Sequence, residues 1–195
     1  MKVLVACEFS GVVREAFAAR GHDALSCDLL PTEIPGNHYQ GDVFDLINDP
    51  AYQFDLMIAH PPCTRLCNSG VCWLAKRNLW DEMREGAEFF KKLMDADIPK
   101  IAVENPIPHH YAVDIIGRKY DQIIQPWQFG HGETKATCLW LKNLPKLIPT
   151  NIVDGREQRL HRVPPGPDRW KIRSTTYTGI AEAMADQWGD TCPAS

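Results

Sequence analysis

The chain has 195 residues, of which 44% are hydrophobic and 24% charged, and its formal net charge is −4. These values are typical of one globular domain with a substantial core, and the mild charge excludes a general electrostatic attraction to nucleic acid. No window of the sequence approaches the roughly 18 consecutive apolar residues of a membrane helix. Because Glu8 interrupts the first apolar run early, that run predicts a strand rather than a signal peptide. We therefore expect an intracellular, cytoplasmic protein.

The predicted elements alternate between strand and helix patterns along the chain. The first half contains a strand at 2–6, a helix at 12–20, a strand at 24–27, a Pro/Gly-rich loop at 31–37, a short strand that ends around 40–43 and a strand at 54–59. The second half contains an irregular loop at 61–71, a long helix at 75–95, strands at 101–103, 123–125 and 137–141, an extended connection at 145–172 and a final amphipathic helix at 177–188.

This alternation predicts a single domain with a doubly wound, mostly parallel, seven-stranded Rossmann-like sheet. In such folds, ligands bind beyond the carboxyl edge of the sheet, where the parallel strands end. Polar and reactive side chains that follow the predicted strands are therefore the first candidates for a functional site.

The fourth predicted strand ends in His60-Pro61-Pro62-Cys63. Two prolines cannot extend a sheet, so Cys63 leaves the strand on a stiff turn. A stiff turn suits a nucleophile that must hold its position, provided that a neighbouring charge or helix end lowers its pKa. The alternative is a buried structural cysteine that follows a proline turn.

The fifth predicted strand ends in Glu104-Asn105-Pro106. A carboxyl group that ends a hydrophobic strand needs a hydrogen-bond partner or a raised pKa if it is buried. A protonated glutamate can donate a proton to a ring nitrogen, which is the work of a general acid. The alternative is a solvated carboxylate at a strand end.

The first three strands are followed by residues that suit a nucleotide-like ligand. Asp28 follows the second strand, where an acid commonly binds a ribose diol, and Asp42 follows the third. Gly11, in Phe9-Ser10-Gly11, allows the backbone to approach a ligand at a helix start. Aspartate is also a common turn former, so each of these signals is weak alone.

The order of these features along the chain resembles that of the DNA cytosine-5 methyltransferases. The shared features are Phe-x-Gly at 9–11, the acid at 28, Gly-Asp-Val at 41–43, Pro-Cys at 62–63, Glu-Asn at 104–105, the segment 129–137 before a strand, and Tyr-Thr-Gly-Ile-Ala at 177–181. The match spans most of the chain, and Pro-Cys with Glu-Asn is its most specific part.

The resemblance implies that S-adenosylmethionine is the methyl donor and that DNA is the substrate. It places the cofactor against Phe9, Ser10, Gly11, Asp28, Leu29, Asp42, Val43 and Pro61. It makes Cys63 the nucleophile that attacks carbon 6 of a flipped cytosine, while Glu104 protonates ring nitrogen 3. In the 129–137 segment, Lys135 and Thr137 stand where the family has arginines, and Lys135 is the best surviving candidate for the catalytic, oxygen-binding role of those arginines.

This sequence departs from the family pattern in the cofactor loop and in length. Val13 replaces the second glycine of that loop, which narrows or shifts the pocket, and His60 precedes Pro-Pro-Cys, where a small residue or Phe would be less notable. Only about 30 residues occupy the place of the usual target-recognition region. We expect the chain to read a short DNA context, to rely on a recognition partner protein, or to act on another cytosine-containing substrate.

The same short segment is rich in basic residues, which either track DNA phosphates or form a solvated loop. The candidate nucleic-acid contacts are Arg65, Arg156, Arg159, Arg162, Arg169, Lys171 and Arg173.

Two alternatives compete with the methyltransferase interpretation. The chain could be an inactive, methyltransferase-like protein that binds nucleic acid or a partner as a regulator. It could also be a thiol- or metal-dependent enzyme that uses Cys63, Cys67 and Cys72 beside His60. The count of seven cysteines and the absence of a secretion signal favour free thiols, and the spacings match no common metal-ligand template. We therefore expect no metal site.

Overall fold

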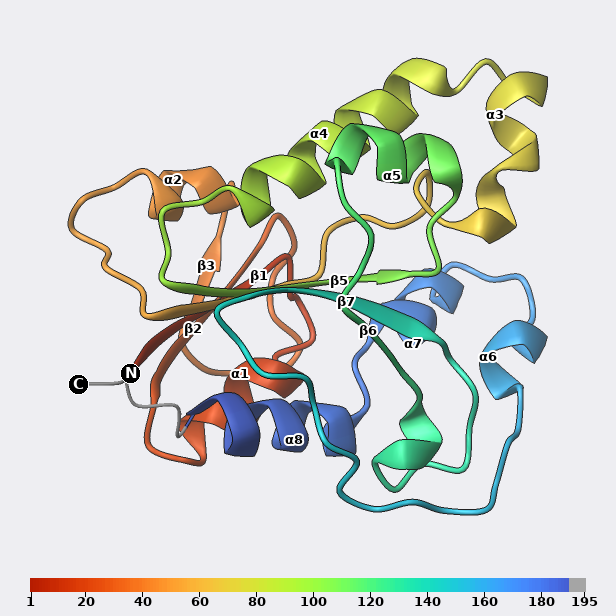
Figure 1. The fold of residues 1–195 in the computed structure, drawn as a ribbon. Coiled ribbons are helices and arrows are strands. Elements are labelled where there is room, and N and C mark those ends of the chain that lie inside the picture. The colour runs from red at the N-terminus through yellow and green to blue at the C-terminus, as the bar shows by residue number, and fades with distance from the viewer. Residues whose placement is uncertain (190–195) are drawn as a thin grey trace.

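A computed structural model of the protein describes residues 1–189 and contains one seven-stranded sheet (Figure 1). The strands are β1 (Lys2–Ala6), β2 (Asp23–Asp28), β3 (His38–Gln40), β4 (Leu56–Ala59), β5 (Lys100–Pro106), β6 (Gln122–Ile124) and β7 (Thr137–Lys142). Their order across the sheet is β3-β2-β1-β4-β5-β7-β6. Strands β1 to β5 pair in parallel, and β7 runs antiparallel to both of its neighbours. This arrangement confirms the predicted α/β fold with a mostly parallel sheet.

Helices cover both faces of the sheet (Figure 1). They are α1 (Val12–Ala18), α2 (Val43–Ile47), α3 (Cys72–Lys76), α4 (Trp80–Met94), α5 (His110–Ile116), α6 (Arg159–Arg162), α7 (Arg169–Ser174) and α8 (Thr178–Gly189), with short 3-10 turns at Asn68–Gly70 and Pro126–Gln128. Helices α2, α4 and α5 lie on one face, and α1 and α8 lie on the other.

The alternation of side chains along each strand divides the core into two apolar layers, one on each face of the sheet. Leu4, Met57 and Ile101 pack towards α4, whose buried face includes Phe90. The neighbouring residues Val3, Val5 and Ile58 belong to the other layer, with α1 and α8. Because both faces are covered, the central strands are apolar throughout, and the polar residues of interest are confined to the strand ends.

Three helical features differ from the sequence-based prediction. Helices α2 and α5 were not predicted, because five and seven residues are too few for a clear helical period. The predicted single helix at 75–95 is two helices, α3 and α4, separated by a turn in which Asn78 has a φ of 50°. The axis of α3, before the turn, therefore runs in a different direction from the axis of α4 (Figure 1).

The segment predicted to be an extended connection at 145–172 contains α6 and most of α7, and is otherwise irregular. It runs from the end of β7 round the edge of the sheet and returns over the carboxyl ends of the strands (Figure 1). Within residues 1–189, no helix is both long enough and apolar enough to cross a membrane.

Candidate functional site

His60 and Glu104 lie side by side at the carboxyl edge of the sheet because of the register between β4 and β5. Ala59 pairs with Val103 in this parallel ladder, so the next residue of each strand comes to the same level and points to the same face. His60 follows the end of β4, whereas Glu104 lies inside β5, two residues before its end. The distance between His60 Nδ1 and Glu104 Oε1 is 3.2 Å.

This pair is largely buried, with 9% of the His60 side chain and 16% of the Glu104 side chain exposed. Burial opposes ionisation of both groups, but their mutual attraction outweighs it. The pKa of His60 is raised by Glu104, and the pKa of Glu104 is lowered by His60 and then by Lys135. The sequence left open either a polar partner or a raised pKa for a buried Glu104. The structure gives Glu104 a partner, His60, and a lowered pKa.

Cys63 is a partly buried free thiol on the loop that follows the two prolines. Burial, then the neighbouring Cys67 and Glu104, raises the pKa of Cys63 to about 11, and Lys135 acts in the opposite direction. The lowered pKa expected for a nucleophile is therefore absent in this state of the protein. Any activation of Cys63 must come with the ligand, or from a closer approach of a cation.

One cavity connects these side chains with the end of β1. Its lining includes seven of the residues predicted from the sequence, together with Glu8 and His60. The seven are Phe9, Ser10, Pro61, Cys63, Glu104, Lys135 and Arg173. The structure thus brings the three predicted catalytic residues into one site with three of the predicted cofactor residues.

The loop after Cys63 is fixed to the start of α5 by His109, whose role the sequence did not reveal. His109 is buried, its Nδ1 accepts a hydrogen bond from Ala112 N at the helix start, and its Nε2 lies 2.8 Å from Arg65 O. The backbone of Leu66 also accepts a hydrogen bond from His109 N. A histidine directly before a short helix was the only available signal. These contacts anchor the loop that carries Cys63 on the side away from the sheet.

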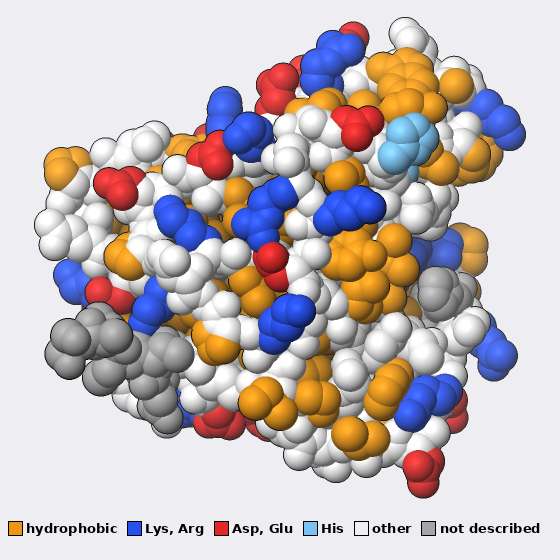
Figure 2. All heavy atoms as spheres, in the orientation of Figure 1, with side chains coloured by type: hydrophobic (Ala, Val, Ile, Leu, Met, Phe, Trp, Pro, Cys, Tyr) orange, Lys and Arg blue, Asp and Glu red, His pale blue; other side chains and the backbone are white. Residues whose placement is uncertain are grey.

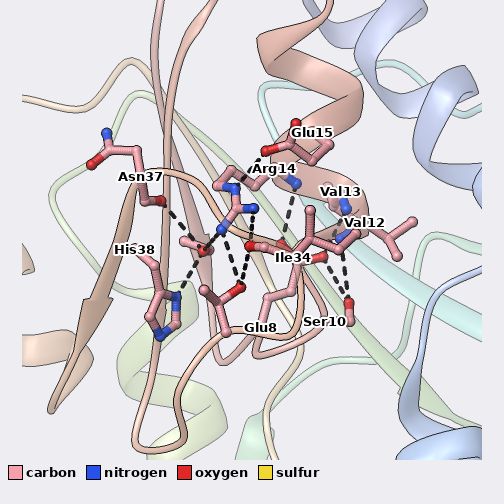
Figure 3. Close-up of polar contacts among 11 residues, drawn as sticks. Glu8, Ser10, Val12, Val13, Arg14, Glu15, Ile34, Asn37 and His38 are labelled. Carbon is pink, nitrogen blue, oxygen red and sulfur yellow. Dashed lines mark hydrogen bonds and ion pairs between the residues drawn. The ribbon is translucent and has the colours of Figure 1, made fainter.

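At the end of β1, the start of α1 is closed by a side chain of the protein itself (Figure 3). The Glu8 carboxylate accepts hydrogen bonds from Val13 N (2.7 Å), Arg14 N (3.2 Å) and the Ser10 hydroxyl (3.2 Å). Val13, which replaces the family's second glycine, is fully buried in the core. The backbone N–H groups that a ligand would use at this helix start are therefore already bound.

Gly11 has a structural reason for its presence that the sequence did not show. Its φ is 76°, and a Cβ there would lie 2.8 Å from Arg14 Nη2. The buried Arg14 guanidinium donates to Ser26 Oγ, Thr32 Oγ1 and the Ile34 carbonyl, and it also pairs with Glu15 (Figure 3). This network fixes the loop between β2 and β3 to α1.

The other five predicted cofactor residues, Gly11, Asp28, Leu29, Asp42 and Val43, lie outside the cavity lining. Asp28 accepts a hydrogen bond from Leu30 N, and the exposed Asp42 caps α2 by accepting one from Phe44 N. Leu29 is exposed, whereas Val43 is buried in the core. Asp28 and Asp42 nevertheless both raise the pKa of Cys7, after burial, which brings it to about 12. The two carboxylates therefore share one end of the sheet.

Helix α7 lies over the β1 side of the cavity. Trp170 contacts the Phe9 ring with centroids 5.2 Å apart, and Lys171 pairs with Glu33 at 3.2 Å. Arg173 lines the cavity itself. The segment that replaces a target-recognition region thus covers the face of Phe9 on which the resemblance placed the cofactor.

Several of the predicted phosphate contacts are paired within the protein. Arg65 pairs with Glu82 at 2.8 Å, Arg159 pairs with Glu133 and Glu157, and the Arg156 guanidinium lies 3.8 Å from the centre of the Trp127 ring. In residues 1–189, the ion pairs involve none of Arg162, Arg169 and Arg173. On the face drawn in Figure 2, basic and acidic side chains are interspersed.

The thiol cluster considered as a metal site does not form one in the described part of the chain. Among the side chains that the structure describes, those of residues 1–160 and 162–189, no three or more of His, Cys, Asp or Glu are grouped so that they could hold a metal ion. Cys67 lies 3.1 Å from Ser69 Oγ, and Cys72 is exposed at the start of α3.

Solved structures with the same fold are methyltransferases. A protein described as a DNA modification methyltransferase encoded within a prophage, from E. coli, matches with a TM-score of 0.53 and 14% identity, over 78% of this chain and 52% of its own. The methyltransferase EhMeth of Entamoeba histolytica matches with a TM-score of 0.50 and 14% identity, over 78% of this chain and 57% of its own. This chain therefore spans about half the length of these structures.

Comparison by sequence gives no relative, since neither a protein-family model nor a curated protein matches this chain. The structural likeness establishes that the chain has a methyltransferase fold. Activity and substrate must be argued from the site.

Proposed function

We propose that this protein transfers a methyl group from S-adenosylmethionine to carbon 5 of cytosine in DNA, through a covalent bond to Cys63. The observation that carries the proposal is the convergence of Cys63, Glu104 and Lys135 on one cavity at the carboxyl edge of a methyltransferase fold. A thiol beside a carboxyl group and a cation can add to a pyrimidine ring and control the resulting charge.

The proposed roles follow from the chemistry of a ring that is attacked at carbon 6. The Cys63 thiol loses its proton to solvent and its sulfur bonds to carbon 6. Ring nitrogen 3 receives a proton from Glu104, and carbon 5 becomes nucleophilic as a result. Lys135 opposes the effect of burial on the Cys63 pKa, and we assign it to stabilisation of the thiolate. Carbon 5 would then take the methyl group from the cofactor's sulfonium, which would leave as a neutral thioether. Loss of the carbon 5 proton to solvent breaks the carbon–sulfur bond, nitrogen 3 returns its proton to Glu104, and the methylated base is released.

The residues at the end of β1 to β3 fit S-adenosylmethionine in part. The cofactor supplies the methyl group, and Asp28 and Asp42 offer carboxylates at the strand ends for its hydroxyl and amino groups. Phe9, Ser10 and Pro61 line the same cavity as Cys63. Because Glu8 closes the start of α1, binding relies on side chains rather than on that helix start.

DNA as the substrate is supported by the exposed residue Arg173, which lines the cavity. Since Arg65, Arg159 and Lys171 are paired within the protein, few basic side chains remain for phosphates. We therefore propose weak and loosely sequence-specific DNA binding by the protein alone, and a separate recognition partner where a defined sequence is read.

The test is an assay with methyl-labelled S-adenosylmethionine and duplex or single-stranded DNA, followed by digestion to nucleosides. We expect 5-methylcytosine from the wild-type protein and from Cys67→Ser, and none from Cys63→Ser. DNA that contains 5-fluorocytosine should form a covalent complex through Cys63. Absence of 5-methylcytosine with wild-type protein, or label on another base, would exclude the proposed function.

A further inference from the structure

His60 is a buried, polar wall of the cavity that the proposed roles leave unused. Its Nδ1 lies 3.2 Å from Glu104 Oε1, and its backbone N–H donates to Ala6 O at 2.9 Å, which fixes the residue at the edge of the sheet. The side chain is 9% exposed and lines the same cavity as Cys63 and Lys135.

Neither ring nitrogen of His60 has a well-aligned hydrogen bond within the described residues. The contact of Nδ1 with Glu104 has the distance of an ion pair, but not the direction of a settled N–H···O bond. Buried polar atoms are almost always hydrogen-bonded, because an unpaired one costs about 1–3 kcal/mol. An imidazole that has a carboxylate within reach and no fixed partner is suited to move a proton.

The charges around His60 come from each of the strand ends that meet there. Glu104 on β5 and Glu8 after β1 favour the imidazolium, whereas Lys135 before β7 disfavours it. Burial also disfavours it, but the pKa of His60 is raised because Glu104 outweighs that effect. Both pKa directions therefore favour a proton on His60 and a carboxylate at Glu104 in the free protein.

We propose that His60 is the proton source for Glu104, so that the acid of this site is a His60–Glu104 pair rather than Glu104 alone. This inference rests on the proposed function. The imidazolium gives its Nδ1 proton to the Glu104 carboxylate, and the neutral carboxyl group formed in this way passes a proton on to ring nitrogen 3 of the base. Glu104 begins and ends as a carboxylate, and His60 becomes neutral. When the carbon–sulfur bond breaks, the proton returns by the same route.

The position of the proton can be measured without any substrate. In ¹⁵N-histidine NMR spectra of the full chain, with His60→Asn used to assign the signal, we expect His60 to be doubly protonated at pH 7. Glu104→Gln should convert it to the neutral form at that pH, because burial then outweighs the weaker attraction of Glu8. A neutral His60 in the wild-type protein, or a signal that Glu104→Gln does not change, would overturn the proposal.

The role in the reaction is tested by the exchange of tritium from carbon 5 of cytosine in DNA and by methyl transfer, each measured from pH 5.5 to 8.5. We expect His60→Asn to be about 100-fold slower at pH 7 and to recover towards acid pH, where Glu104 takes a proton from solvent. His110→Asn, at an exposed histidine, serves as the control and should match the wild type. An unchanged rate, or the same loss at every pH, would contradict a proton-supplying role.

These outcomes separate the two proposals. If the wild-type protein neither exchanges tritium nor methylates cytosine, the proposed function fails and His60 has no base to serve. If the wild-type protein is active but His60 is neutral, or the pH profile of His60→Asn is that of the wild type, only the present inference fails.

Discussion

The two halves of the carboxyl edge treat their buried charges differently. At the end of β1 and β2, Glu8 and Arg14 are enclosed in hydrogen bonds to backbone and hydroxyl groups, so these charges serve folding (Figure 3). At the end of β4 and β5, His60 and Glu104 have each other and few fixed partners. Polar groups that are already bound cannot take up a ligand without loss, whereas incompletely bound ones can. We therefore expect the chemistry to take place at the ends of β4 and β5.

The largest expected effect is the loss of stability when Arg14 is replaced, which tests whether the charges at the end of β1 and β2 serve folding. Arg14→Met removes four hydrogen bonds from a buried position and leaves the Ile34 carbonyl without its charged donor. We expect the free energy of unfolding to fall by about 3 kcal/mol in urea denaturation. Arg84→Met, which breaks an exposed pair with Asp81, should cost under about 0.5 kcal/mol. Similar losses for the two variants would show that the Arg14 network is not structural.

The next effect is on the reactivity of Cys63, which lies in the half of the carboxyl edge at the end of β4 and β5 and whose pKa is raised to about 11. The thiolate forms only as the pH rises, so alkylation of Cys63 by iodoacetamide should accelerate about tenfold per pH unit from pH 8 to 10. At pH 8 it should be at least about tenfold slower than for free cysteine, since higher nucleophilicity offsets only part of the deficit. Peptide mass spectrometry, with Cys63→Ser to assign the site, measures this. A plateau below pH 9 would contradict it.

A smaller effect, on stability, is expected at Glu8, in the half of the carboxyl edge at the end of β1 and β2. Glu8→Gln keeps an oxygen acceptor but loses the negative charge at the start of α1. We expect a loss of about 1 kcal/mol in the free energy of unfolding. Glu15→Gln, at an exposed carboxylate of the same helix, is the matched control for loss of charge. If Glu8→Gln is more stable than the wild type, the carboxylate is retained for binding rather than for folding.

The smallest effect on stability is expected where α7 contacts Phe9, which follows the end of β1. Phe9 and Trp170 are in ring contact at 5.2 Å, with an angle of 55° between their planes. A double-mutant cycle with Phe9→Leu and Trp170→Leu should give a coupling free energy of about 0.5–1 kcal/mol in thermal or urea unfolding. A coupling of zero would mean that α7 does not rest on Phe9 in solution.

Much of the fold could be predicted because the apolar patterns are strong. All seven strands and the helices at α1, α4 and α8 follow from them, and the sheet is mostly parallel as expected. Helices α2 and α5 could not be predicted, because short helices depend on caps such as Asp42 and His109 more than on periodicity. The start of α3, at Cys72, lies between the predicted loop at 61–71 and the predicted helix at 75–95, and the end of α3 was assigned to that helix.

The candidate site was predicted in its members but not in its charge state. Cys63, Glu104 and Lys135 lie on one cavity, as the proposed chemistry requires, yet the roles of these residues stay predictions. The sequence suggested a proton on Glu104 and an activated Cys63. The structure instead places His60 beside Glu104 and raises the pKa of Cys63. Burial and partner distance set both pKa values, and neither can be derived from one sequence.

The sequence by itself determined which residues end the strands of the sheet, because strand apolarity and the prolines after β4 are local properties. Only the tertiary structure decided which of those residues meet. The parallel register of β4 and β5, which pairs Ala59 with Val103, sets His60 against Glu104 across 44 residues of chain. Likewise, the return of α7 over Phe9 and the internal pairing of Arg159 and Lys171 depend on contacts between distant segments. Such contacts decide which charged side chains are paired within the protein and which of them are available to a ligand.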